Sequence, residues 1–301
     1  MKHLFILNPI AGGGLKTEKV RKDILKIMPS RSEKWELYET LGVRDAIRKV
    51  REQAALGEEL RVYACGGDGT LNECVNGAVG SPHVAVTHFP AGTGNDFIKT
   101  FSSGAERFFK LENLLDPHEI MLDLIELDGR YGINICSVGL DARIAADVHK
   151  YNKLPYVKGK TAYFFSLLAN VAKGIAAPFE VEIGGKIFKR EFTLICLCNG
   201  SSYGGAFTPV PEALPNDGVL EILLVEKTSR LRVLNLVKTY AAGQYQTQPK
   251  LITHMQGTEM TIRSDYEIAV NADGEILHTK EVTFKLMPGA LRFFLPKGTG
   301  I

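Results

Sequence analysis

Short apolar runs alternate with helical patterns through the first 125 residues of the chain. The runs are predicted strands at 4–7, 35–39, 60–65 and 84–89, and the segments between them predict helices at 17–28, 43–56 and, after a loop, within 66–79. Strands separated by helices of this length predict βαβ units and a parallel sheet. We therefore expect an α/β domain over residues 1–125.

Three glycine-rich segments, 11–14, 66–69 and 91–94, each follow the end of one of these strands. The carboxyl ends of parallel strands meet at one edge of a sheet, and ligands of such sheets bind there. The sequence therefore predicts that all three segments gather at one edge.

From about Met121 the pattern changes to strands joined by turn residues, with helices only at 141–150, 160–174 and about 229–242. The predicted strands are 121–127, 131–138, 179–183, 186–198, 219–226, 260–263, 267–270 and 280–286. We therefore expect an α/β plus β fold, with a second, β-sandwich-like domain at 126–288. The tail at 289–301 is a separate segment that can return to the first domain.

The composition excludes several classes of protein. The chain is 45% hydrophobic and 23% charged, with a net charge of +2, so no charge excess requires a nucleic-acid partner. No run approaches the ~20 apolar residues of a membrane-spanning helix, and the run at 4–7 is too short for a secretory signal. Five cysteines without regular spacing favour a reducing compartment. We expect a cytoplasmic protein.

The segment Gly66-Gly67-Asp68-Gly69-Thr70 has the composition of a phosphate-binding loop. Its glycines let the backbone approach a ligand closely, and a helix starting at Thr70, with Glu73 at capping-box spacing, would present free N–H groups to an anion. A carboxylate at position 68 would be repelled by phosphate unless a cation intervenes, which indicates Mg²⁺ and phosphate chemistry. The alternative is a plain tight turn.

The segment 89–97 repeats this design with a strand, a glycine and threonine loop, and a helix capped by Asn95 or Asp96. Thr93 offers a hydroxyl and the glycines offer backbone amides. Asn8-Pro9 with residues 12–14 could close a third side around a nucleotide.

Together these motifs resemble the catalytic family of the diacylglycerol kinases, and most closely its soluble bacterial lipid kinases. The resemblance runs through nearly the whole chain. It rests on 66–70 with Asn72-Glu73, on 90–96, on Asn8-Pro9, and on 139–142, 199–200, 204–205, 216–218 and 273–275.

The resemblance implies ATP-dependent phosphorylation of a lipid hydroxyl in a cleft between the two domains. The ATP contacts that it implies are Asn8, Gly12, Thr40, Gly66, Gly67, Asp68, Gly69, Thr70, Asn72 and Thr93. Asp273 and Glu275 match the acidic pair near the reacting hydroxyl, and Asp123 matches a carboxylate close to it. A structural Mg²⁺ would be held by the Asp217 side chain and the carbonyls of Leu214 and Val219. Ala11 departs from the family, which usually has a small hydroxyl residue there.

The acidic pair has a chemical rationale, because a lipid alcohol needs a carboxylate to orient it and accept its proton. Either Asp273 or Glu275 could be that base. On sequence alone, Asp273-Gly274 is also a favoured turn dipeptide and Glu275 an ordinary surface residue.

A lipid kinase also needs access to a bilayer. The segment 149–160 is basic and aromatic and precedes an apolar stretch at 161–168, a composition that suits an anionic membrane surface. The alternatives are a solvated loop and a buried helix. The resulting hypothesis is a peripheral enzyme at the inner face of the membrane, and a homodimer is compatible with it.

Two rival functions stay open. One is an NAD kinase, whose family resembles this chain in the Gly-Gly-Asp-Gly-Thr motif but lacks the loop seen here at 90–96. The other is a catalytically silent protein that binds nucleotide or senses lipid. Retention of Asp68, Asp273 and Glu275 argues against the silent protein, because a binder needs no base. No single residue selects one lipid acceptor, and the resemblance makes diacylglycerol or a related lipid the default, because the family is named for it.

Overall fold

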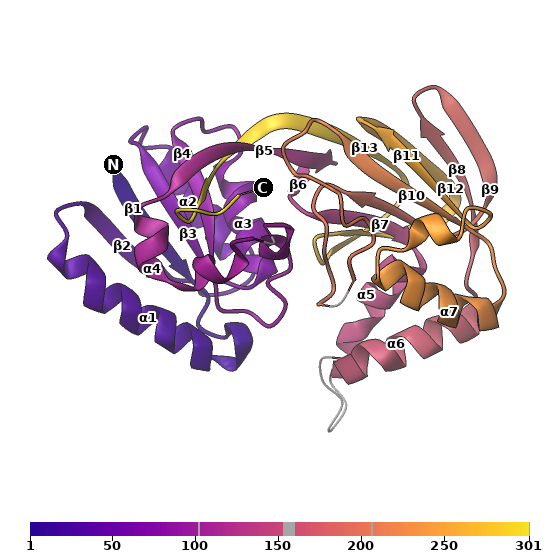
Figure 1. Ribbon diagram of the computed structural model, residues 1–301, viewed down its shortest axis with the longest axis horizontal. Coiled ribbons are helices and arrows are strands. Elements are labelled where there is room, and N and C mark those ends of the chain that lie inside the picture. Colours follow the sequence, from indigo (N-terminus) through magenta and orange to yellow (C-terminus); the bar gives the residue numbers. More distant parts are fainter. Residues whose placement is uncertain (102, 153–159, 206, 301) are drawn as a thin grey trace.

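The computed structural model describes residues 1–301 apart from 102, 153–159, 206 and 301 (Figure 1). The helices are α1 (Leu15–Ile27), α2 (Asp45–Ala54), α3 (Asp68–Ala78), α4 (Leu111–Leu115), α5 (Leu140–Asn152), α6 (Lys160–Lys173) and α7 (Arg230–Ala241). The strands are β1 (Lys2–Leu7), β2 (Lys34–Glu39), β3 (Leu60–Gly66), β4 (Val84–Pro90), β5 (His118–Leu127), β6 (Arg130–Gly132), β7 (Ile135–Gly139), β8 (Ala177–Ile183), β9 (Lys186–Cys198), β10 (Leu220–Glu226), β11 (Ile252–Gly257), β12 (Glu259–Ala272) and β13 (Glu275–Leu295).

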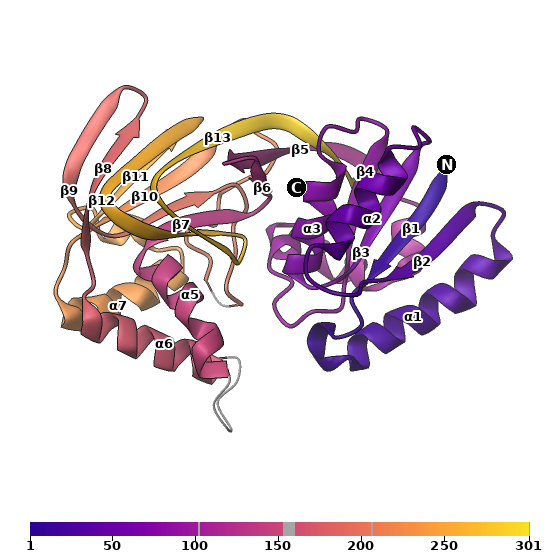
Figure 2. The ribbon, with the colours of Figure 1, turned by 180° about the vertical axis from the view of Figure 1, so that it is seen from behind.

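The first four strands pair in parallel in the order β4-β3-β1-β2. Every residue of β4 is buried, as expected for a strand covered on both faces. The two opposite views show α2 and α3 on one face of this sheet and α4 on the other (Figures 1 and 2). The connections run in opposite directions from β1 and β3, so the loops after these two neighbouring strands open at a topological switch point, where ligands of such sheets bind.

Helix α2 illustrates why the sequence folds this way locally. Ala46, Val50 and Ala54 recur every four residues and are buried, while the intervening charged residues face outward. Its buried stripe packs on α3, where a Cβ at Gly77 would lie 2.7 Å from Cβ of Val50. Glycine at position 77 therefore lets the two helices approach closely.

The second half is built from antiparallel strands. The central pairs are β9 with β7, β8 and β10, and β12 with β7, β8 and β13. Helices α5, α6 and α7 lie together on one side of these strands (Figure 1). Among the described residues, no helix is both long enough and apolar enough to cross a membrane.

Several sequence-based boundaries in this half are wrong in detail. The run 131–138 is two strands, β6 and β7, while 260–263 and 267–270 belong to one strand, β12, interrupted by an irregularity between Arg263 and Ile268. Strand β11 is missing from the expectations because its segment, Ile-Thr-His-Met-Gln-Gly, has no clear apolar alternation.

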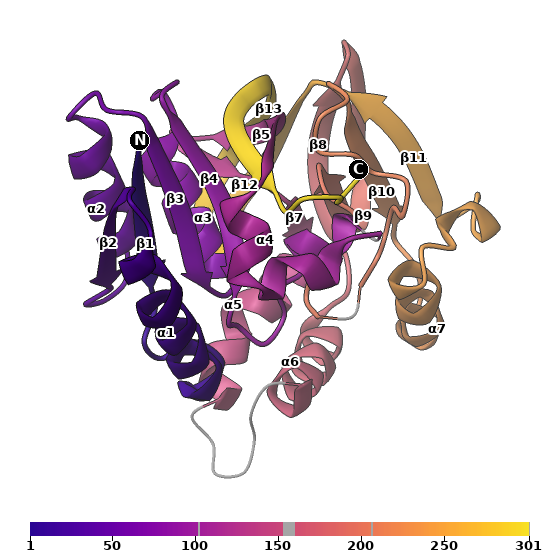
Figure 3. The ribbon, with the colours of Figure 1, turned by 60° about the vertical axis from the view of Figure 1, so that its left-hand side comes forward.

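Strand β13 joins the two halves into one continuous sheet of 13 strands. Its first part pairs with β12, and its last part pairs with β5 and, in parallel, with β4 at Arg292 and Phe293. Figure 3 shows this strand arching from one half to the other. The segment after Gly289 thus lies against the first half, where the hydroxyl of Thr87 donates to the carbonyl of Phe294 at 2.7 Å.

Candidate active site

The first glycine-rich loop follows β1 and is held by Asn8. Oδ1 of Asn8 accepts the backbone N–H of Ile10, and its Nδ2 donates to Oγ1 of Thr70, both at 3.2 Å. Gly12 has a φ of +56°, and a Cβ there would lie 2.2 Å from the carbonyl oxygen of Ala91. The first and third loops therefore touch at a position that only glycine can fill.

The second loop is tied to the third through one carbonyl group. The oxygen of Gly66 accepts the backbone N–H of Ala91 at 2.7 Å, that of Gly92 at 3.0 Å, and Nε2 of His88 at 3.0 Å. A Cβ on Gly92 would lie 2.4 Å from Cα of Gly67. The two loops thus pack backbone to backbone, with no room for a side chain at Gly92.

Helix α3 begins at Asp68, with Gly67 as its N-cap, so its unpaired first-turn N–H groups point toward these loops. The predicted start at Thr70 is two residues late. The predicted capping box is also wrong, because the carboxylate of Glu73 accepts the backbone N–H groups of Arg44 at 2.9 Å and Ala46 at 3.2 Å. Glu73 therefore stabilises the start of α2.

The third loop does not lead into a side-chain-capped α-helix, contrary to expectation. It leads into a 3₁₀ helix, Phe97–Thr100, whose N-cap Asp96 makes no side-chain cap. Asn95, at φ +49°, instead closes the loop on itself by exchanging two hydrogen bonds of 3.1 Å with the backbone of Gly92.

The three loops line a pocket of about 530 Å³ at the predicted edge of the sheet. Its walls include eight of the residues singled out from the sequence, namely Asn8, Gly12, Thr40, Gly67, Gly69, Thr70, Thr93 and Glu275. The first seven are expected ATP contacts, and Glu275 reaches the same space from β13. Gly66, Asp68 and Asn72 are not among the lining residues: Gly66 lies behind the loops, and the other two face elsewhere.

A second pocket of about 230 Å³ contains Asp68, Asp96 and Asp273 together with Asp141 and Asn271. It lies between the first half, which supplies Asp68 and Asp96, and the second half, which supplies the others. The turn at 273–275 contributes to both pockets, with Glu275 in the first and Asp273 in the second.

Asp68 is bonded to the third loop. Its Oδ1 accepts the backbone N–H of Asp96 at 2.6 Å and that of Phe97 at 3.3 Å. Asp96 in turn pairs with Lys99 and accepts the backbone N–H of Gly205 at 2.8 Å. The sequence offers Asp96 as a candidate helix cap and as part of the motif at 90–96. Its link to residue 205 is a long-range contact that local pattern does not reveal.

Asp273 is the most heavily hydrogen-bonded carboxylate of this region. It accepts the backbone N–H groups of Ile133 at 2.6 Å, Asn134 at 3.1 Å and Ile135 at 2.9 Å, and Nδ2 of Asn72 at 3.1 Å. Burial of the carboxyl group nevertheless raises its pKa to about 6, because desolvation of the charge outweighs these donors. The side chain of Asn72, an expected ATP contact, therefore donates its hydrogen bond to Asp273.

Asp123 does not line either pocket. It is 3% exposed, and its oxygens accept the backbone N–H groups of Gly218 at 2.8 Å and Gly289 at 2.7 Å. It therefore fastens the loop that carries Asp217 to β5 and β13. Partial burial, then the negative charges of Asp123 and Glu221, raise the pKa of Asp217.

The expected metal ligands lie on this same loop. Oδ1 of Asp217 accepts the backbone N–H of Val219 at 2.9 Å, and Leu214 precedes Pro215, whose carbonyl accepts the N–H of Asp123. No three His, Cys, Asp or Glu side chains come together as a metal site within the described part of the chain. A cation here would depend on Asp217 and backbone carbonyls.

The basic segment at 149–160 lies largely outside the described residues. Lys150, which is described, pairs with Asp147 at 2.5 Å. His88 and Asp141 are the residues near the site to which sequence reasoning gave no role. Asp141 was part of the motif at 139–142, but its place between two cavities is visible only in three dimensions.

Comparison with known proteins bears on both halves. Residues 2–127 match the diacylglycerol kinase catalytic domain, and residues 134–295 match the YegS C-terminal NAD kinase beta sandwich-like domain. A diacylglycerol kinase of Staphylococcus epidermidis is 27% identical over 293 residues, covering 97% of this chain and 91% of that protein. A candidate lipid kinase of Staphylococcus haemolyticus is 27% identical over 232 residues, 77% of this chain and 75% of that protein.

The fold is shared with a solved structure. The crystal structure of a candidate diacylglycerol kinase from Bacillus anthracis superposes with a TM-score of 0.77 at 24% identity, covering 99% of this chain and 96% of that one. The chain therefore belongs to the diacylglycerol kinase family, with a catalytic domain followed by a YegS-type β-sandwich-like domain.

Proposed function

We propose that this protein is an ATP- and Mg²⁺-dependent kinase that phosphorylates the hydroxyl group of a lipid. The observation that carries the proposal is the pair of adjoining pockets that share the turn at 273–275. One pocket has glycine-rich walls that let a nucleotide phosphate chain approach the backbone, and the other holds the carboxylates that an alcohol acceptor needs.

The nucleotide pocket fits the phosphates of ATP through its backbone. Gly12, Gly67 and Gly92 pack so closely on neighbouring loops that side chains there would close the cradle. The first-turn N–H groups of α3 and its dipole would stabilise negative charge. Asn8 and Thr70, joined by a hydrogen bond, and Thr93 would add polar side-chain contacts.

Asp273 is the stronger candidate for the base. It lines the acceptor pocket, and its pKa of about 6 leaves it largely ionised at neutral pH but close enough to accept a proton. The acceptor oxygen would form its bond to the γ-phosphorus as the bond to the β,γ-bridging oxygen breaks, and Asp273 would take the hydroxyl proton. Glu275, in the nucleotide pocket, would face the phosphates, where a carboxylate requires a cation.

The loop at 214–219 fits a structural Mg²⁺. Burial, and then the negative charges of Asp123 and Glu221, raise the pKa of Asp217, and a cation bound there would offset that accumulation of negative charge. Asp217 and the carbonyls of Leu214 and Val219 would hold the ion, and Asp123 would fix the loop around it. On the phosphates, Mg²⁺ would supply neutralisation of the charge that develops during transfer.

Such an enzyme would work at the cytoplasmic face of a membrane and meet its substrate there. The similarity to proteins named diacylglycerol kinase and lipid kinase supports this class of acceptor. A homodimer stays a prediction.

The test is transfer of the labelled γ-phosphate of ATP, with Mg²⁺, to a panel of lipids in mixed micelles and to NAD⁺. Asp273→Asn and Glu275→Gln are compared with Asp265→Asn, an exposed aspartate on β12. We expect a labelled lipid with wild type and with the control, and at least a hundredfold loss in Asp273→Asn. Labelled NAD⁺ instead would make the protein an NAD kinase. ATP binding without any labelled product would favour the silent sensor.

A further inference from the structure

Asn76 lies one turn after Asn72 on the face of α3 that meets the second half of the chain. Its side chain is 9% exposed, and both ends of its amide bind the backbone of Tyr131 in β6. Oδ1 accepts the N–H of Tyr131 at 3.0 Å, and Nδ2 donates to the carbonyl of Tyr131 at 2.8 Å. Asn76 itself lines neither of the two pockets.

The backbone of Tyr131 allows Asn76 only one amide orientation. A peptide N–H can only donate and a carbonyl oxygen can only accept. The oxygen of Asn76 must therefore face the N–H, and its nitrogen must face the carbonyl. The reverse orientation would set oxygen against oxygen and N–H against N–H, and it would leave buried polar groups without partners.

The orientation of Asn76 in turn fixes that of Asn72. Nδ2 of Asn76 also donates to the main-chain carbonyl of Asn72 at 2.9 Å and to its Oδ1 at 3.1 Å. Because Nδ2 of Asn76 is a donor, the atom of Asn72 that faces it must be the oxygen. The nitrogen of Asn72 is then turned to the carbonyl of Tyr131 at 3.0 Å and to Oδ2 of Asp273 at 3.1 Å.

Asp273 depends on this orientation of Asn72. Within the described part of the chain, Asn72 is the only side chain that donates to Asp273, and its other donors are the backbone N–H groups of residues 133–135. If the amide of Asn72 turned over, its oxygen would face the carboxylate. A donor that stabilises the ionised base would then be replaced by an acceptor that repels it.

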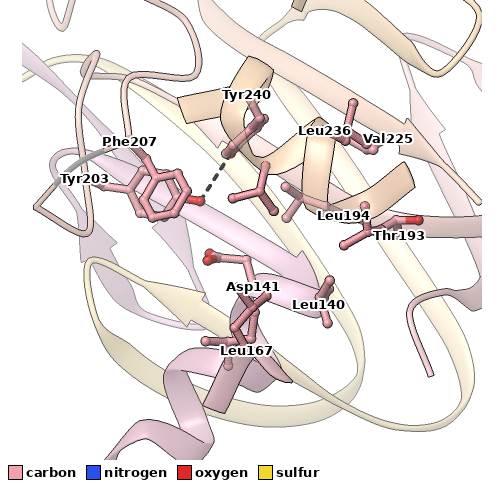
Figure 4. Close-up of a pocket in the computed structure, with 13 residues that line it drawn as sticks. Leu140, Asp141, Leu167, Thr193, Leu194, Tyr203, Phe207, Val225, Leu236 and Tyr240 are labelled. Carbon is pink, nitrogen blue, oxygen red and sulfur yellow. Dashed lines mark hydrogen bonds between the residues drawn. The ribbon is translucent and has the colours of Figure 1, made fainter. Parts of the chain in front are cut away.

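The other titratable groups around Asp273 are acidic. They are Asp68, Asp96 and Asp141 in the same pocket, Glu275 on the same turn, and the Cys136 thiol of β7. The carboxylate of Asp141 accepts the hydroxyl of Ser137 at 2.7 Å, and Asp141 lies below Tyr203 and Tyr240 in Figure 4. Ionised carboxylates only accept hydrogen bonds, so none of them can replace the donation from Asn72.

We propose that Asn76 is a positioning residue for phosphoryl transfer, which holds the amide of Asn72 in the one orientation that donates to the carboxylate of Asp273. The chain of hydrogen bonds begins at the N–H of Tyr131, which cannot be reversed, and ends at the proposed base. This role rests on the proposed function, and it belongs to a residue that lines neither the nucleotide pocket nor the acceptor pocket.

The first experiment measures the pKa of Asp273 directly, by carbon NMR of protein labelled with 13C at the aspartate carboxyl groups. The signal of Asp273 is the one missing from Asp273→Asn. Its pKa is about 6 in wild type, and Asn76→Leu, which is similar in size and has no donor, should raise it by about half a unit or more. Exposed Asn235→Leu is the control and should leave it unchanged.

A double-mutant cycle shows whether Asn76 acts through Asn72. Asn72→Ala alone should also raise the pKa of Asp273. In that background, Asn76→Leu should change the pKa by less than about 0.2 unit, because the amide that it orients is gone. If Asn76→Leu does not unfold cooperatively, Asn76→Ala takes its place, because alanine also removes the donor and suits a helix.

Two outcomes would overturn the proposal. One is an unchanged pKa of Asp273 in folded Asn76→Leu and Asn76→Ala. The other is an equal shift with and without Asn72, which would mean that Asn76 only supports the local backbone.

The activity of the same variants separates this role from the proposed function. In a lipid kinase, the acidic limb of kcat/KM against pH should move with the pKa of Asp273, and kcat should fall more than the KM for ATP rises. If no lipid is phosphorylated but the pKa shifts as expected, the orienting role of Asn76 stands and the kinase assignment fails. If lipid is phosphorylated and neither the pKa nor the acidic limb moves in Asn76→Leu, the kinase assignment stands and this role fails.

Discussion

Asn72 of α3 donates from Nδ2 to Oδ2 of Asp273 at 3.1 Å, across 201 positions of sequence and across the junction of the two halves. The same Nδ2 also donates to the carbonyl of Tyr131 at 3.0 Å. Helix α3, which begins at the proposed phosphate-binding loop, is therefore bonded directly to the proposed base. In the proposed function, this hydrogen bond would therefore link the nucleotide site directly to the acceptor site.

Replacing Asn72 should shift the titration of Asp273. The hydrogen bond from Asn72 lowers the pKa of Asp273 against the effect of burial, so Asn72→Ala should raise that pKa further. The acidic limb of the activity profile should then move to higher pH, by about half a unit or more, with a loss of about 1–3 kcal/mol in stability. The measurement is kcat/KM against pH, with exposed Asn235→Ala as control. Loss of activity without a shift would indicate a purely structural role.

In the wild-type protein, kcat/KM should fall as the pH falls through about 6, because Asp273 then becomes protonated. Stability should respond in the opposite direction. The folded protein raises the pKa of Asp273, so its contribution to stability is present below the unfolded value and is lost as the pH rises through about 6. Activity and thermal unfolding measured from pH 5 to 8 test both signs. A flat activity profile across this range would remove Asp273 as the base.

The sequence predicts those parts of this site that depend on residues close together along the chain, and it does not predict contacts between residues far apart. The glycine segments after β1, β3 and β4 were predictable, because strand alternation and parallel pairing dictate that they share an edge. The start of α3 could not be predicted from local pattern. The helix begins at Asp68, two residues before Thr70, because of the backbone conformation of Gly67 and its packing on Gly92. Local spacing predicts a capping box for Glu73, whose carboxylate instead accepts the N–H groups of Arg44 and Ala46.

Side chains whose hydrogen-bond partners are distant in the sequence could not be placed from local sequence pattern. The family resemblance implies that Asn72 contacts ATP, yet its side chain donates to Asp273, 201 residues away. Strand β13, at Glu275–Leu295, could be predicted only as 280–286, because Pro288-Gly289 interrupts its pattern. The strand continues there since Gly289 donates its N–H to Asp123 across an irregular stretch of pairing.

Two glycine substitutions should separate folding from phosphate binding. A Cβ at Gly69 would meet no atom within 4 Å, whereas one at Gly92 would lie 2.4 Å from Cα of Gly67. Gly69→Ala should keep or slightly raise the melting temperature, because alanine suits a helix better than glycine, and should raise the KM for ATP about tenfold or more. Gly92→Ala should lose both stability and ATP binding. Unaltered ATP binding in Gly69→Ala would place the phosphates elsewhere.

His88 should act as a positioning residue for the same loops. It is fully buried, and its Nε2 is bonded to the carbonyl of Gly66, which also accepts the N–H groups of Ala91 and Gly92. Burial lowers the pKa of His88, which favours the neutral ring, with Nε2 as the donor. His88→Leu should cost about 1–2 kcal/mol of stability and raise the KM for ATP more than it lowers kcat. Partial recovery in His88→Gln, which can donate again, distinguishes a hydrogen-bond role from simple packing.

Removal of Mg²⁺ should destabilise the loop at 214–219. Burial and, after it, the negative charges of Asp123 and Glu221 raise the pKa of Asp217, so a divalent cation would stabilise the ionised carboxylate. The melting temperature in millimolar Mg²⁺ should exceed the melting temperature in EDTA by about 2 °C or more, as expected for a ligand that binds only the folded state. In Asp217→Ala this difference should vanish, while exposed Asp265→Asn should retain it. A Mg²⁺ effect of equal size in Asp217→Ala would show that the ion binds at another place.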